Sequence, residues 1–127
     1  MEEFVFERLQ VWQKGRTLVK EVYSLLDCFP NFEKYALCDQ IRRAIISVPS
    51  NIAEGSGRPS YKERIHFVEI AYGSLMECYC QLVLAEDLGY IPAEHRIALK
   101  PKFEEVAKML SGFRNYLRNQ GQEPKAD

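Results

Sequence analysis

The sequence lacks the features that mark membrane, secreted or β-sheet proteins. It has no apolar run near the roughly 20 residues that a membrane span needs. It begins with the acidic Glu2 and Glu3 rather than a basic segment followed by an apolar one, so we expect no signal peptide and a cytoplasmic location. Sustained two-residue alternation and Asn-Gly or Asp-Gly turns are also missing, which disfavours β-strands.

The charge shows little excess of either sign. Seventeen Lys and Arg residues against 18 Asp and Glu residues leave a formal net charge of −1, which excludes a uniformly basic chain. A local basic patch remains compatible with this balance. The four cysteines, Cys28, Cys38, Cys78 and Cys80, are expected to be reduced thiols in the cytoplasm.

Helical periodicity is what the sequence does contain. Apolar residues recur at intervals of three and four in four segments, which predicts helices over about residues 7–28, 35–54, 60–88 and 93–118. Ser60 with Glu63 forms a capping box for the third helix. The polar segment 119–127 is expected to fray.

Four amphipathic helices with short connections predict an all-α fold, a single antiparallel up-down-up-down four-helix-bundle domain over residues 1–127. Pro49 lies inside the second helix, where it removes a backbone hydrogen bond and should kink the helix. Pro101 should kink or break the fourth.

Two of the helices carry more apolar residues than a bundle core requires. Ile46 on the second helix and four residues of the third lie away from the core-facing stripes. The four are Phe67, Ile70, Leu84 and Leu88. Exposed apolar patches often mark interfaces, so we expect a homo-oligomer that uses the outer faces of these two helices.

Candidates for catalysis and metal binding are few. The two histidines, His66 and His95, have no neighbouring nucleophile. Cys78 and Cys80 diverge by about 200° on a helix and do not match a zinc-binding pair. We therefore expect no enzymatic activity, no metal and no cofactor.

The most unusual segment surrounds Pro49. Short polar side chains, Ser47, Ser50 and Asn51, flank the proline and can satisfy loosened backbone groups. Glu54 belongs to the same motif, and Gly55 with Gly57 ends the helix. A structural polar staple is favoured over a ligand contact.

Basic residues gather in three short stretches, and they are Lys14 and Arg16, Arg42 and Arg43, and Arg58, Lys62 and Arg64. Basic stretches on helices are often only solvated faces. In an oligomer, however, symmetry would multiply such patches into a field that attracts phosphates.

Several motifs resemble the proteins encoded within intervening sequences of bacterial 23S rRNA. The similarity covers nearly the whole chain, from Phe6–Lys14 through Gln40–Ala44 and Tyr72–Glu77 to Leu88–Ile91. It is most specific at Ser47–Arg58. The resemblance implies an antiparallel four-helix bundle, commonly a homopentamer. It also implies kinship with the accessory variability proteins of diversity-generating retroelements, which bind nucleic acid.

Two functions follow as hypotheses. The first is a non-enzymatic oligomer that binds structured RNA, such as ribosomal RNA, through the seven basic residues. The alternative is a scaffold that docks a partner protein on a homo-oligomeric ring, and neither involves a membrane.

Overall fold

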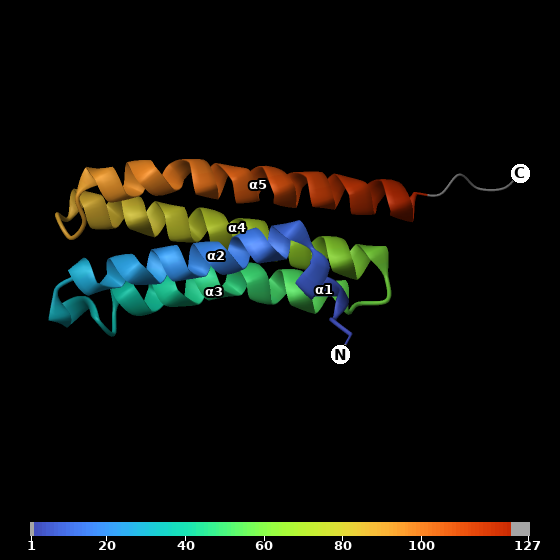
Figure 1. The fold of residues 1–127 in the computed structure, drawn as a ribbon, viewed down its shortest axis with the longest axis horizontal. Coiled ribbons are helices and arrows are strands. Elements are labelled where there is room, and N and C mark those ends of the chain that lie inside the picture. Colours follow the sequence, from blue (N-terminus) through green and yellow to red (C-terminus); the bar gives the residue numbers. More distant parts are fainter. Residues whose placement is uncertain (1, 123–127) are drawn as a thin grey trace, which may run out of the picture.

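The computed structural model describes residues 2–122, which are almost entirely helical and include no strand. Four long helices carry the fold: α2 (Gln10–Leu25), α3 (Leu37–Ser56), α4 (Tyr61–Asp87) and α5 (Ala93–Gly121). A short helix, α1 (Val5–Arg8), precedes them, and two 3-10 turns, η1 (Leu26–Cys28) and η2 (Asn31–Glu33), connect α2 to α3. In Figure 1 the chain reverses direction at each connection between the long helices.

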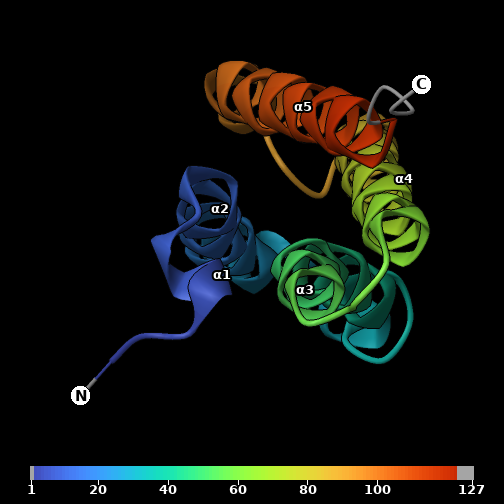
Figure 2. The same cartoon turned by 90° about the vertical axis from the view of Figure 1, so that its right-hand side faces the viewer.

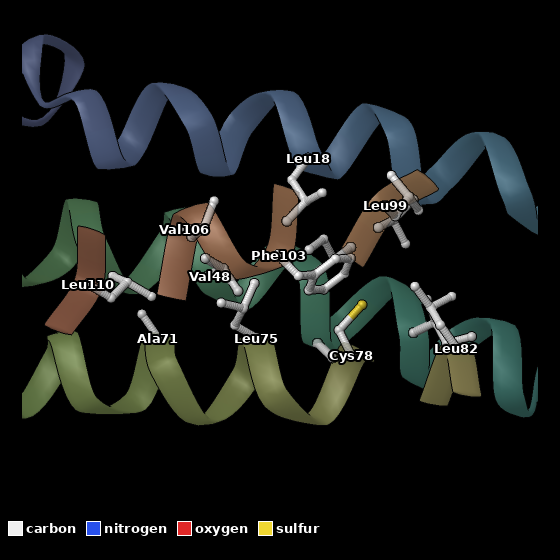
Figure 3. Close-up of a cluster of buried hydrophobic side chains, with 14 of the residues drawn as sticks. Leu18, Val48, Ala71, Leu75, Cys78, Leu82, Leu99, Phe103, Val106 and Leu110 are labelled. Atoms are coloured by element: carbon white, nitrogen blue, oxygen red, sulfur yellow. The ribbon is translucent and has the colours of Figure 1, made fainter. Parts of the chain in front are cut away.

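The core lies where the four helices meet. Viewed end-on, they surround it, with α2 and α4 on opposite sides (Figure 2). Figure 3 shows side chains from all four helices interlocking there, including Leu18, Val48, Leu75 and Phe103. Each of these four is at most 2% exposed. The apolar stripes that the sequence predicts thus supply the core.

Helix boundaries differ from the prediction at three places. The predicted helix over residues 7–28 is divided at Leu9, whose ψ of 125° is extended. α5 continues through Pro101 to Gly121, so it is not broken at the proline, and residues 119–121 are helical rather than frayed. Residues 123–127, the rest of the predicted tail, lie outside the described part of the chain.

Ser60 is the N-cap of α4, as predicted, although the reciprocal contact with Glu63 is made by the Ser60 hydroxyl. The Ser60 hydroxyl accepts a hydrogen bond from the backbone N–H of Glu63 at 3.2 Å and lies 3.0 Å from the Glu63 carboxylate. This cap fixes the start of α4 directly after the tight turn from α3, and it thereby positions the basic residues of that turn.

Candidate nucleic-acid interface

The seven predicted basic residues fall in three separate places. Arg42 and Arg43 lie in the first half of α3, and Lys14 and Arg16 lie on α2. Arg58, Lys62 and Arg64 surround the turn between α3 and α4. Arg42 lies 14 residues before the end of α3 at Ser56, which corresponds to about 21 Å of helix, so the groups do not form one patch.

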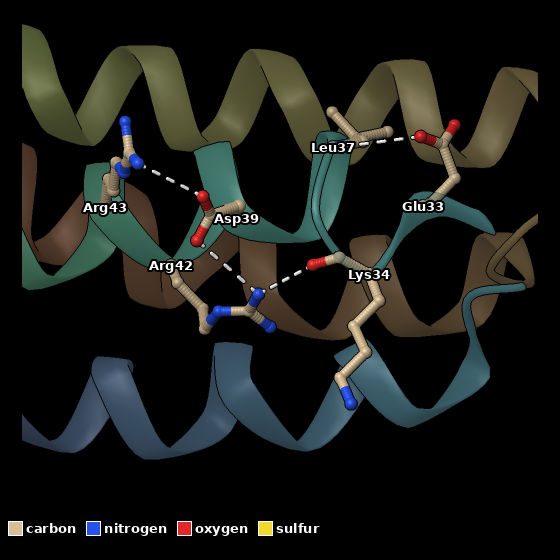
Figure 4. A network of polar contacts seen from close by, with 6 residues as sticks. All are labelled: Glu33, Lys34, Leu37, Asp39, Arg42 and Arg43. Atoms are coloured by element: carbon tan, nitrogen blue, oxygen red, sulfur yellow. Dashed lines mark hydrogen bonds and ion pairs between the residues drawn. The ribbon is translucent and has the colours of Figure 1, made fainter. Parts of the chain in front are cut away.

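Arg42 and Arg43 share one carboxylate (Figure 4). Asp39 lies 3.5 Å from the Arg42 guanidinium and 3.2 Å from that of Arg43. Arg42 also donates from Nη2 to the backbone carbonyl of Lys34 at 2.7 Å, which ties the connection preceding α3 to the helix. Arg42 is therefore largely structural, whereas the Arg43 side chain is 80% exposed and open to a ligand.

The turn between α3 and α4 holds the densest basic group, which we call the turn cluster (Arg58, Lys62 and Arg64). The Arg64 Nε donates to the Arg58 carbonyl at 2.7 Å, and Arg58 pairs with Glu54 at 2.9 Å. Lys62 is exposed and has no ion pair within residues 2–122. The cluster thus offers one free ammonium beside two ordered guanidinium groups.

Aromatic rings support both guanidinium groups of the turn cluster. Arg58 lies over the ring of Phe67 at 5.0 Å, and Arg64 lies over the ring of Tyr61 at 5.1 Å. Such cation–π contacts restrict the side chains without neutralising them. Arg118 on α5 lines the hollow next to Lys62 and Tyr61 and pairs with Glu69 at 3.3 Å.

Lys14 and Arg16 point to different neighbours. Lys14 pairs with Glu105 of α5 at 3.4 Å, whereas Arg16 lies over the Trp12 ring at 5.4 Å and lines a groove against α3. Residues two apart on a helix diverge by about 200°, so these two cannot act on one phosphate group.

The segment around Pro49 builds contacts between helices. Ser47 Oγ and Ser74 Oγ are 2.7 Å apart, which joins α3 to α4. The Asn51 amide donates to both the carbonyl and the hydroxyl of Ser47 at 2.8 Å. These hydrogen bonds join the segment to α4 and link Asn51 to Ser47 one helical turn before it.

Glycines let the helices approach closely beside this staple. A Cβ on Gly55 would lie only 2.8 Å from the Phe67 Cβ, so α3 and α4 are in near contact there. A Cβ on Gly15 would lie 3.6 Å from Val48 Cγ1 and 3.9 Å from Pro49, so α2 and α3 also pack tightly. The segment thus acts in packing.

The five residues predicted for an oligomer interface do not share one surface. Phe67 is half-buried under Arg58 and against Gly55. Ile46 is 42% exposed and lines the groove between α2 and α3. Ile70 and Leu84 are exposed on α4 and Leu88 directly after it, on a different part of the molecule.

The cysteines are free thiols, as predicted. Cys28 and Cys80 are exposed, whereas Cys38 and Cys78 are buried. Burial, with a smaller contribution from Glu77, raises the pKa of Cys78 to about 12, so this thiol is unreactive at neutral pH.

Between residues 2 and 122, no three metal-ligating side chains gather, and no helix is long and apolar enough to cross a membrane.

Sequence reasoning missed the partners of the turn cluster. Tyr61, Phe67 and Arg118 surround it, but the sequence predicts no role for Tyr61 or Arg118 and assigns Phe67 only to an oligomer interface. Tyr61 stands three residues before Arg64, a spacing that places both on one face of a helix and could have indicated the stacked pair. Arg118 comes from another helix, so no local pattern points to it.

Comparisons with known proteins agree with this fold. The family model described as 23S rRNA-intervening sequence protein matches residues 7–112. A crystal structure of a protein of unknown function from the S23 ribosomal protein family of Bacteroides thetaiotaomicron has a TM-score of 0.73. It is 22% identical, and the match covers 82% of this chain and 97% of that one. Comparison with curated proteins gives no match. With most of its length inside the family model, the chain belongs to the 23S rRNA-intervening sequence protein family.

Proposed function

We propose that this chain is a non-enzymatic protein that binds structured RNA through the turn cluster. The observation that carries the proposal is the convergence of Arg58, Lys62 and Arg64 at one end of the bundle, with both guanidinium groups held over aromatic rings. Ordered cations lose less side-chain entropy when they bind phosphate, so a small cluster can contribute useful affinity.

The electrostatics of the turn add to this support. The first backbone N–H groups of α4 carry the positive end of the helix dipole close to Lys62. Glu54 and Glu63 reduce the local charge, so the affinity of one chain should be modest. The family name refers to 23S rRNA, which directs the proposal to RNA rather than to another polyanion.

Self-association would strengthen such binding. The proposed assembly is a cytoplasmic homo-oligomer, a pentamer by resemblance, of antiparallel up-down-up-down bundles kinked at Pro49. Several copies of the turn cluster acting on one RNA would raise the overall affinity without new contacts.

The test is a fluorescence-anisotropy titration with a folded fragment of ribosomal RNA at several salt concentrations. Binding should weaken with salt, with a slope of about 0.9 per phosphate contact. Lys62→Ala should weaken binding and reduce that slope by about 1, and it should leave the fold intact because Lys62 is exposed and forms no ion pair within residues 2–122. The matched control is Lys100→Ala, an exposed lysine near the start of α5. Absence of binding at low salt, or equal effects of both variants, would contradict the proposal.

A second candidate function, a scaffold for a partner protein, is favoured by the apolar groove between α2 and α3. Affinity capture from cell extract separates the two candidates. A protein partner that stays bound after nuclease treatment favours the scaffold, and loss of the captured material after nuclease favours RNA binding.

A further inference from the structure

A groove between α2 and α3 combines an apolar floor with uncompensated positive charge. Its volume is about 410 Å³. Arg16 and Lys20 of α2 stand along it, and neither forms an ion pair within residues 2–122. The remaining lining is mostly apolar: Trp12, Val19, Ile46, Pro49 and Ala53, with Ser50. We call this surface the α2–α3 groove.

The outer side of α4 combines exposed apolar residues with a negative charge. Ile70, Glu77, Leu84 and Leu88 follow one another at intervals of seven, seven and four, so they form a single stripe along the helix. Ile70 is 37% exposed and Leu88 is 57% exposed. Glu77 is also exposed and has no ion pair in the described part of the chain. These residues, with Gly73, are the α4 stripe.

Gly73 leaves an open space on the α4 stripe. It lies in the interior of a 27-residue helix, where glycine costs about 1 kcal/mol relative to alanine. A Cβ at this position would meet no atom within 4 Å, so packing inside the chain does not explain the glycine. A missing side chain on an exposed helix lets another backbone come close.

From these surfaces we infer that the α4 stripe of one copy packs into the α2–α3 groove of a second copy. Apolar residues then face apolar residues, and Glu77 meets Arg16 and Lys20, none of which forms an ion pair within residues 2–122. Figure 2 places α2 and α4 on opposite sides of the bundle, so a groove and a stripe in one chain cannot meet each other.

The geometry of this contact has a definite consequence. Because the two surfaces differ, the contact is heterologous, and each copy keeps a free groove or a free stripe until the assembly closes on itself. A contact of one surface with itself would stop at a dimer. The inference rests on the self-association in the proposed function and is independent of RNA binding.

The first test uses one variant on each side of the contact. Ile46→Glu places a charge in the groove, and Leu84→Glu places one on the stripe; both side chains are more than 40% exposed, so folding should tolerate the changes. The wild-type chain should sediment as an oligomer at about 50 µM, a concentration that populates moderate-affinity complexes. Each variant alone should lose more than about tenfold in self-association affinity and sediment as a 14.8 kDa monomer.

Mixing the two variants distinguishes the possible contacts. The Ile46→Glu chain keeps its stripe and the Leu84→Glu chain keeps its groove, so an equimolar mixture should form a pair of about twice the 14.8 kDa monomer mass and nothing larger. If the mixture stays monomeric, the heterologous contact is wrong.

Two glycine substitutions distinguish a loss of assembly from a loss of folding. Gly73→Gln fills the space left on the stripe, and it should block assembly while retaining or raising the melting temperature of the chain. Gly112→Gln is the control: Gly112 lies in α5, also faces open space, and is outside both surfaces, so assembly should persist.

The experiments distinguish failure of this contact from failure of self-association as a whole. A wild-type chain that is monomeric at about 50 µM overturns both this contact and the self-association it rests on. An oligomer that survives both Ile46→Glu and Leu84→Glu overturns this contact alone. In that case a partner protein would be the remaining occupant of the α2–α3 groove. RNA titration of the monomeric variants measures the turn cluster separately.

Discussion

At the scale of single residues, Gly55 sets how closely α3 approaches α4. Gly55→Ala would bring a Cβ to 2.8 Å from the Phe67 Cβ. The Phe67 Cβ is bonded directly to the backbone, so it cannot move away by rotation of the side chain. Overpacking of this kind costs about 1–3 kcal/mol, partly offset by the better helix propensity of alanine. Urea denaturation should show a net loss of about 1–2 kcal/mol.

Gly112→Ala is the matched control for this change. It lies in a helix interior with nothing within 4 Å of the added Cβ, so the same substitution should stabilise the chain by about 0.5–1 kcal/mol. Equal stabilisation by both variants would contradict the close contact at Gly55.

Cys78 gives the stability of the fold a pH dependence at high pH. Its pKa is raised by burial from 9.0 in the unfolded chain to about 12 in the folded one. The folded state therefore retains the proton, and the stabilisation is complete below pH 9 and declines as the pH rises from about 9 toward 12. Between pH 8 and pH 10 this thiol should remove about 1 kcal/mol from the free energy of unfolding.

Urea denaturation of Cys78→Ala measures that contribution. The variant should be less stable at every pH, because it leaves a small cavity, but its loss of stability between pH 8 and pH 10 should be smaller by about 1 kcal/mol. If the slopes of wild type and Cys78→Ala coincide, the Cys78 thiol does not titrate in this way.

At the scale of helices, periodicity predicted the four long elements because each one buries a continuous stripe. It did not predict the division at Leu9, because the cause lies in contacts across the bend. The Phe6 and Trp12 rings meet edge to face at 4.9 Å, and the Gln13 side chain donates to the Glu7 carbonyl at 2.8 Å. No proline or glycine marks that position in the sequence.

The candidate site was predictable only in part for the same reason. The sequence identified Arg58, Lys62 and Arg64 as neighbours because they lie within seven residues of one another. The sequence also grouped them with Arg42 and Lys14. In the structure these two residues pair with the acidic residues Asp39 and Glu105 respectively. Asp39 is three residues from Arg42, but Glu105 comes from α5 and becomes a neighbour only through the fold.

At the scale of the whole molecule, the four helices are not held together equally. α3 and α4 are joined by the Gly55 contact, by the Ser47–Ser74 hydrogen bond and by Gln81 donating to Gln40 at 3.4 Å. α2 and α5 instead border a hollow of about 270 Å³ that is spanned by two exposed ion pairs. They join Lys14 to Glu105 at 3.4 Å and Lys102 to Glu21 at 2.7 Å.

This inequality predicts the order in which the bundle opens. Exposed ion pairs contribute about 0–1 kcal/mol each, and a poorly filled seam adds little burial, so α2 should separate before α3 and α4 do. Native-state hydrogen exchange at increasing urea should show α2 amides opening at a lower free energy than core amides of α3 and α4, which should exchange only by global unfolding. Lys102→Ala should widen that gap by lowering the opening free energy of α2 alone. If amides of all the long helices exchange at one common free energy, the α2–α5 seam is as strong as the α3–α4 contact, and the bundle opens only as a unit.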